Sequence, residues 1–217
     1  SDKVSQLAFA AYSGMKKAGI GACLKHFPGH GDTATDSHLG LPILHKSKAE
    51  LEAEELLPFQ VGINQGVEMI MVGHLAVPAL TGGKNIPASI SRELITDLLK
   101  GEMGFKGLVI SDALNMKAVA NLYPEPGELE WQAFHAGNDL LCFSDHVSEG
   151  ITKIAQQYLA QMKTEQIDTL VLGCTHYPLL TGVISYVMGN DVTLVSSAEE
   201  TAKDLYRTLV ESNLLND

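Results

Sequence analysis

Residues 69–74 read MIMVGH, a short apolar run that ends in a glycine and a polar side chain. The run is too short for a helix and does not alternate between apolar and polar residues, so it predicts a strand buried on both faces. Similar short runs recur along the whole chain. They lie at 22–24, 108–110, 139–143, 170–172 and 192–195.

Stretches of helical period separate these runs. They cover 4–17, 49–65, 91–100, 148–162 and 198–210. Strand and helix repeated six times predicts an α/β protein built from six parallel β/α units. We expect a single three-layer, doubly wound sheet of the flavodoxin-like kind, and the alternative is an open partial TIM barrel or a domain-swapped dimer.

Composition and charge narrow the classes of function. Hydrophobic residues make up 45% of the 217 residues, which is enough for a folded core and argues against disorder. The formal net charge of −11 disfavours nucleic acid and anionic membranes as partners. The chain opens on Ser1 without a signal peptide or a long apolar span, so we expect a cytoplasmic protein.

Cysteine usage points the same way. The three cysteines are far apart and form no CxxC pair, which fits a reducing compartment. Cys23 and Cys142 lie inside apolar runs and are expected in the core. We expect neither a cofactor nor a metal ion.

Polar residues follow the expected strands, where α/β folds place their sites. Because parallel strands end at one edge of a sheet, these residues are expected on a single rim. The strand-end residues are the loop 25–38, Gly73-His74, Ser111-Asp112, Ser144-Asp145 and the segment 173–176.

The first candidate site begins in the loop 25–38, which reads KHFPGHGDTATDSH. Asp36 and His38 are two residues apart, and a histidine beside a carboxylate can be held in one tautomer and used to move protons. Lys25 and His26 stand where the strand gives way to the loop, and both could donate hydrogen bonds to hydroxyl groups.

A carboxylate at a second strand end completes the pattern. Asp112 directly follows the run at 108–110, where it could attack the anomeric carbon of a sugar. Retaining glycosidases combine such a nucleophile with a proton donor on the opposite side of the bond. The other histidines have plainer interpretations: we expect His30 and Asp32 to stabilise the loop, and His45 and His74 to be structural or exposed.

Together, the loop 25–38 and the stretch ISDALNM at 110–116 resemble glycoside hydrolase family 3, in particular its bacterial β-N-acetylhexosaminidases. The resemblance covers about residues 1–150 and implies the C-terminal half of a TIM barrel. It also implies a role for each matching residue. Asp112 would be the nucleophile, His38 the acid/base partnered by Asp36, and Lys25 and His26 ligands of the N-acetylglucosamine hydroxyls.

A second motif lies further along the chain, where residues 173–180 read GCTHYPLL. This stretch resembles the C-terminal part of glutamate racemases, over about the last 60 residues. The resemblance implies that Cys174 is one of two proton-transferring thiols, that Thr175 holds the substrate and that His176 assists the cysteine. A helix start after Cys174 would also lower the pKa of its thiol.

The two motifs suggest a join between two enzymes. We interpret the chain as an engineered chimera, with a hydrolase segment at 1–154 and a racemase-like segment at 155–217 fused into one domain. Because each parental site looks incomplete, we expect little or no catalysis. Two alternatives stay open. One is a retained β-N-acetylglucosaminidase, with two chains pairing in a homodimer to complete the barrel. The other is residual binding of a small sugar or anion at the rim.

Overall fold

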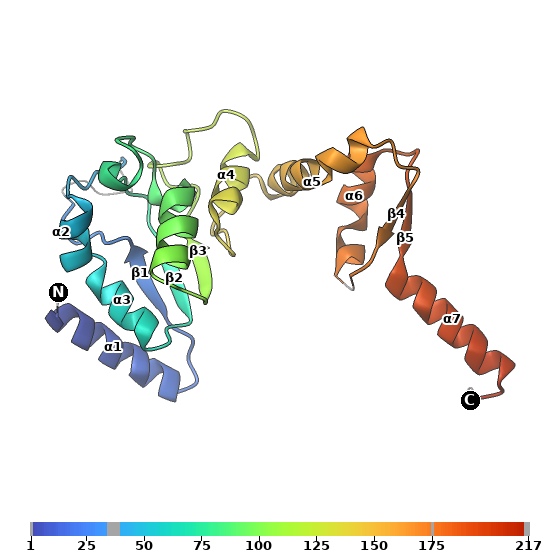
Figure 1. Cartoon of the computed structure of the whole chain (residues 1–217), viewed down its shortest axis with the longest axis horizontal. Coiled ribbons are helices and arrows are strands. Elements are labelled where there is room, and N and C mark those ends of the chain that lie inside the picture. Colours follow the sequence, from blue (N-terminus) through green and yellow to red (C-terminus); the bar gives the residue numbers. More distant parts are fainter. Residues whose placement is uncertain (1, 34–39, 175, 215–217) are drawn as a thin grey trace. The chain divides into compact units, whose positions relative to one another are not determined.

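The computed structural model describes residues 2–33, 40–174 and 176–214 and shows an α/β chain with parallel strands (Figure 1), as expected from the sequence. The chain divides into two compact units, Ser1–Gly150 and Ile151–Asp217. The division falls close to the boundary at 154 that the change of motif suggested.

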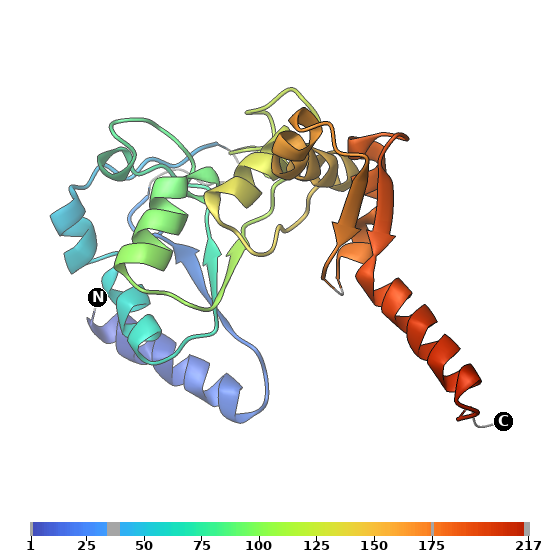
Figure 2. The same ribbon diagram turned by 45° about the vertical axis from the view of Figure 1, so that its right-hand side comes forward.

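The first unit is built on three parallel strands, which lie side by side in Figure 2. They are β1 (Cys23–Phe27), β2 (Met69–Val72) and β3 (Leu108–Ser111). Their order in the sheet follows their order in the chain. Sequential order is the pattern of a barrel wall, whereas a doubly wound sheet reverses direction once.

The fourth expected strand, at 139–143, is reduced to a single bridge between Leu140 and Ile110. Asp139 is the physical reason. Its carboxylate accepts the backbone N–H of Val109 at 2.8 Å. The side chain thus takes a hydrogen bond that the backbone carbonyl of a neighbouring strand would otherwise accept. Phe143, with φ of 46°, then turns the chain away.

Helices connect and cover these strands. The expected opening helix is α1 (Asp2–Lys17). The single helix expected at 49–65 is instead two, α2 (Lys48–Ala53) and α3 (Leu57–Asn64), because Pro58 cannot continue a helix and starts a new one. A π-helix, η3 (Glu93–Glu102), precedes β3, and α4 (Glu128–Ala136) follows it. Two short 3₁₀ turns lie between β2 and η3, at Pro78–Leu80 and Ala88–Ile90.

The core of the first unit lies between the sheet and its helices. Phe27, Ile70 and Val109 come from the three strands and are fully buried, together with Leu94 and Leu99 of η3. The fit between layers is close at α3, where a side chain on Gly62 would collide with that of Leu24. This packing fixes the strand ends that carry the candidate site.

The second unit is smaller. Two parallel strands, β4 (Thr169–Leu172) and β5 (Thr193–Ser196), form its sheet. Its helices are α5 (Val147–Thr164, which begins in the first unit), the turn η4 (Tyr177–Leu180), α6 (Thr181–Met188) and α7 (Ser197–Glu211). Leu172, Ile184 and Met188 form its core. Helix α7 contains no buried residue.

The described residues therefore form two separate parallel sheets, of three and two strands, and not the single six-stranded sheet expected. The sequential order β1-β2-β3 agrees with the alternative of a partial barrel. Among the described helices, none is both long and apolar enough to cross a membrane.

Candidate active site

Asp112 stands at the end of β3 with its two carboxylate oxygens in different settings. Oδ1 accepts the backbone N–H of Ala113 at 2.8 Å. Oδ2 faces His26, 3.7 Å from Nε2. The backbone is fixed as well, because the Asp112 N–H donates to the carbonyl of Val72 at 2.9 Å. One oxygen is thus anchored and the other is available to a reactant.

His26 belongs to β1, two strands away from Asp112. Its Nε2–Oδ2 distance of 3.7 Å is too long for a direct hydrogen bond, so the two side chains interact electrostatically. Burial lowers the pKa of His26 below its ordinary value and outweighs the attraction of Asp112. At neutral pH the imidazole is therefore uncharged and can both donate and accept hydrogen bonds.

His74, at the end of β2, supports the backbone beside Asp112. It is fully buried, and its Nε2–H donates to the carbonyl of Ala113 at 2.8 Å. Because a carbonyl only accepts, Nδ1 must be the acceptor that binds the Ser89 hydroxyl at 2.7 Å. Burial lowers the pKa of His74, which keeps this neutral tautomer. His74 is structural, as the sequence suggested, and His45 is exposed.

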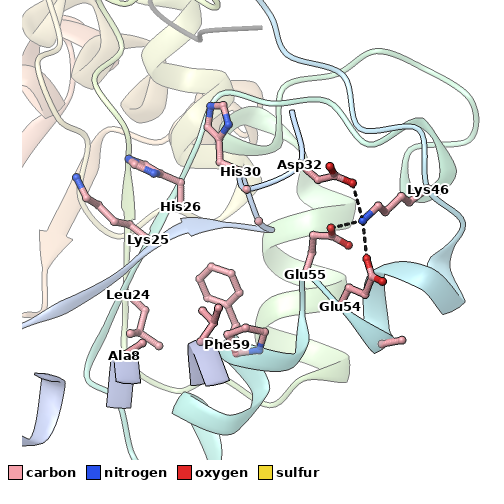
Figure 3. Close-up of a pocket in the computed structure, with 15 residues that line it drawn as sticks. Ala8, Leu24, Lys25, His26, His30, Asp32, Lys46, Glu54, Glu55 and Phe59 are labelled. Carbon is pink, nitrogen blue, oxygen red and sulfur yellow. Dashed lines mark hydrogen bonds and ion pairs between the residues drawn. The ribbon is translucent and has the colours of Figure 1, made fainter. Parts of the chain in front are cut away.

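Two hollows flank these residues. One, of about 400 Å³, is lined by Asp112, Ala113, Asn115, Met116, Lys117 and Phe143. The other is a cleft of about 750 Å³ between α1, β1 and α2–α3. His26 and Lys25 line the cleft at one end, and the labelled carboxylates line the other (Figure 3). His26 thus lines the cleft and also faces the nucleophile candidate.

The structure brings together part of the predicted set. Lys25 and His26 of β1 and Asp112 after β3 lie at the same end of the sheet, with β2 between them, as expected if the strand-end residues share one rim. Asp36 and His38, the predicted proton-transfer pair, lie outside the described residues, and so does Thr175. Their roles stay predictions.

Cys174 and His176 lie in the second unit, after β4. Cys174 is exposed, and its Sγ is 3.9 Å from Nδ1 of His176. The backbone N–H and the side chain of His176 lower the pKa of this thiol. Burial raises the pKa of the other two cysteines, Cys23 and Cys142. Cys174 is therefore the thiol with the greatest thiolate character.

Sequence reasoning missed one residue at the site, Lys46. Its ammonium group contacts Asp32, Glu54 and Glu55, and this cluster closes the far end of the cleft (Figure 3). A lysine just before a helix, followed within nine residues by four glutamates, was the available signal. Across the described part of the chain, no group of three or more His, Cys, Asp or Glu side chains is placed to hold a metal ion.

A sequential parallel wall with a carboxylate nucleophile candidate at a strand end is the arrangement of a barrel-type glycoside hydrolase. Residues 1–171 match the family model described as the glycosyl hydrolase family 3 N-terminal domain, which has a TIM-barrel-type fold. The chain belongs to glycoside hydrolase family 3.

Individual relatives agree with this assignment. The chain is 37% identical over 148 residues to a β-hexosaminidase of Nitrosospira multiformis, covering 67% of this chain and 41% of that protein. A solved family 3 β-N-acetylglucosaminidase of a Paenibacillus species superimposes with a TM-score of 0.61 at 40% identity, over 64% of this chain and 26% of that one. The chain thus spans well under half the length of these relatives.

A relative from a different enzyme class also matches. A glutamate racemase of a Parafrankia species is 52% identical over 93 residues, covering 38% of this chain and 34% of that protein. The match agrees with the resemblance of the GCTHYPLL stretch in the second unit.

Proposed function

We propose that the first unit carries the nucleophile side of a retaining β-N-acetylglucosaminidase site, with Asp112 as the nucleophile. The observation that carries the proposal is the setting of Asp112 at the end of β3, with Oδ1 anchored and Oδ2 facing the uncharged His26. The relatives named β-hexosaminidase and β-N-acetylglucosaminidase supply the substrate class.

The proposed reaction has two steps. Asp112 Oδ2 attacks the anomeric carbon, the glycosidic bond breaks, and a proton from His38, partnered by Asp36, passes to the departing oxygen. Water then attacks the glycosyl–enzyme bond, gives its proton to His38 and releases the sugar and the free carboxylate. Lys25 and His26 hold the sugar hydroxyls throughout.

We expect the rate to be low. The hollow beside Asp112 is wide and one of its lining residues, Phe143, is 73% exposed, so this wall excludes little water. Rate enhancement depends on holding the sugar in a fixed position, and an open hollow does so poorly. The proposal is therefore residual hydrolysis, slower than that of intact relatives.

A chromogenic assay tests the proposal. Nitrophenyl N-acetyl-β-glucosaminide should release nitrophenol above background with the purified chain, and Asp112→Asn should abolish that release because the amide is a poor nucleophile. Asp145→Asn is the matched control, since it alters an exposed carboxylate in the segment between α4 and α5. Undiminished turnover in Asp112→Asn would overturn the assignment.

We further propose that the second unit is a racemase-type segment, and that the chain is a chimera of two enzyme families. The racemase relative and the pairing of Cys174 with His176 support this. Racemisation by two thiols needs a cysteine on each side of the substrate's α-carbon. Cys23 and Cys142 belong to the first unit and are partly buried, so neither is assigned that place.

We therefore expect no interconversion of D- and L-glutamate. Incubation of L-glutamate with the chain in D₂O, followed by chiral chromatography, measures both racemisation and α-proton exchange. Formation of D-glutamate that disappears in Cys174→Ser would contradict this expectation. Unchanged L-glutamate with wild-type protein is the expected result.

A further inference from the structure

We propose that Phe143 is a substrate-binding residue of the candidate active site, and that its ring receives the apolar C–H face of the sugar that reacts at Asp112. The proposal rests on the proposed function, since it takes Asp112 as the group that meets the sugar. Phe143 lines the hollow of about 400 Å³ beside Asp112 and is 73% exposed. An aromatic ring that is open to solvent therefore borders the same hollow as the nucleophile candidate.

The backbone of Phe143 has a conformation that its side chain disfavours. Its φ of 46° lies in the left-handed region, where a Cβ crowds the backbone and bulky residues are rare. Among the described residues other than glycine, positive φ occurs only at Phe143, Gln166 and Asn213. Glycine adopts this conformation without strain, so the turn itself does not require a phenylalanine. A strained residue with an exposed ring beside a candidate nucleophile indicates that the ring is used in binding.

The chain before Phe143 is fixed on both sides of Asp112. The Cys142 N–H donates to the Ser111 hydroxyl at 3.0 Å, and the Leu114 N–H donates to the Cys142 carbonyl at 2.9 Å. Ser111 directly precedes Asp112 and is fully buried. The two bonds hold residue 142 against the segment that carries the nucleophile candidate, so the backbone of Phe143 stays beside it.

The chain after Phe143 is fixed to helix α4. The Ser144 hydroxyl donates to Glu130 Oε1 at 2.8 Å, and the His146 N–H donates to the same oxygen at 3.1 Å. Glu130 is only 4% exposed, so its carboxylate is a buried anchor for this segment. Because both flanks are held, the left-handed turn is imposed on Phe143, and its side chain remains in solvent.

The other residues that line the hollow suit a sugar. A β-linked N-acetylglucosamine ring carries its substituents around its edge and presents C–H bonds on its faces, so it packs favourably on an aromatic ring. Asn115 and Lys117 line the same hollow and carry hydrogen-bond donors that hydroxyl groups can use. A small-molecule site usually combines an apolar wall with a few polar groups in this way.

The contact with Phe143 should affect binding more than the chemical step. The ring touches the sugar before and during the attack by Asp112, and an interaction of equal strength in both states lowers KM without changing kcat. Phe143→Gly should therefore raise KM for nitrophenyl N-acetyl-β-glucosaminide about tenfold and change kcat by about twofold at most. A fall in kcat at unchanged KM would contradict the proposed contact.

The direct test measures binding without turnover. In the Asp112→Asn background, methyl N-acetyl-β-glucosaminide is titrated by saturation-transfer NMR, and Phe143→Gly should raise its Kd about tenfold. Phe143→Tyr should keep Kd within about twofold, because the aromatic face is retained. The matched control is Gln166→Gly, which changes a residue of the second unit with φ of 51° and should leave Kd unchanged.

Three results of this titration would overturn the proposal. They are an unchanged Kd in Phe143→Gly, an equal loss of binding in Gln166→Gly, and no measurable binding by the Asp112→Asn parent.

Stability measured on the same variants tests whether the ring has a structural role instead. Phe143→Gly removes an exposed ring and a strained conformation, so the urea midpoint of the first unit should not fall. A lower midpoint would show that the ring supports the fold and would overturn the proposal. If Asp112→Asn left hydrolysis intact, the proposed nucleophile would fail while the binding result at Phe143 stood.

Discussion

At the scale of single residues, the site depends on two histidines kept neutral by burial. His74 presents Nε2–H to the backbone after Asp112, and His26 faces the free oxygen of that carboxylate. A charged His74 would put a positive charge in a fully buried position, and its Nδ1 would have to donate to the Ser89 hydroxyl instead of accepting from it. The local structure around the nucleophile candidate is therefore sensitive to acid.

The sign of this pH dependence follows from the lowered pKa of His74. Below its unfolded pKa of about 6.5, the unfolded chain binds a proton that the folded chain excludes, so stability falls as the pH drops through that value. We expect the free energy of unfolding in urea to decrease between about pH 7 and pH 5, and to decrease less in His74→Gln. An identical slope in the two proteins would contradict this account.

The three cysteines should differ in reactivity. Cys174 is exposed and has a lowered thiol pKa, whereas burial raises the pKa of Cys23 and Cys142. We expect iodoacetamide near neutral pH to alkylate Cys174 first, and peptide mass spectrometry to show slower labelling of Cys174 in His176→Ala. Labelling of all three thiols at one rate would show that this environment has no effect.

At the scale of elements, five of the six strands predicted from the sequence are present, and so are most of the predicted helices, because their apolar patterns are strong. The prediction failed where a single residue changes the hydrogen bonding of the backbone. Asp139 replaces a strand backbone at the edge of β3, and Pro58 divides one expected helix into two. Neither residue alters the spacing of apolar side chains, so neither change could be predicted from that spacing.

The candidate site was predictable to a similar degree. Asp112, Lys25 and His26 follow apolar runs, so parallel strands brought them to one rim. Lys46 was not predictable in this way, because its contacts with Asp32 and Glu55 form only when separate segments of the chain meet in the folded protein. Contacts between loops carry no period in the sequence.

The close approach of the Gly29 backbone to Glu55 can be tested by substituting Gly29. Its φ of 129° disfavours any side chain, and an added Cβ would press on Glu55. We expect Gly29→Ala to lower the free energy of unfolding by about 2 kcal/mol. Gly31→Ala is the matched control, because an added Cβ there has no neighbour within 4 Å. Equal stability of the two variants in urea would contradict the close approach of Gly29 to Glu55.

At the scale of the whole molecule, the two units have very different cores. The first buries a large cluster drawn from three strands and several helices, while the second relies on Leu172, Ile184 and Met188. Tyr186, Leu205 and Tyr206 of the second unit remain more than half exposed. Stability rises with the fraction of apolar surface buried, so the second unit should be the less stable.

We therefore expect two thermal transitions, with the second unit unfolding first. Hydrogen exchange resolved by peptide should assign the lower transition to α6, β5 and α7. A single transition, with both units losing protection together, would show that the two units form one cooperative domain. That outcome would favour the fused domain expected from the sequence.

The central claim for the whole chain is that Asp112 forms a covalent bond with the substrate sugar. A fluorinated N-acetylglucosaminyl fluoride that forms a slowly hydrolysed glycosyl–enzyme tests it directly, read by intact mass and by peptide mapping. The account predicts one added sugar on the peptide that contains Asp112, and none in Asp112→Asn. Labelling of another residue, or equal labelling of both proteins, would contradict it.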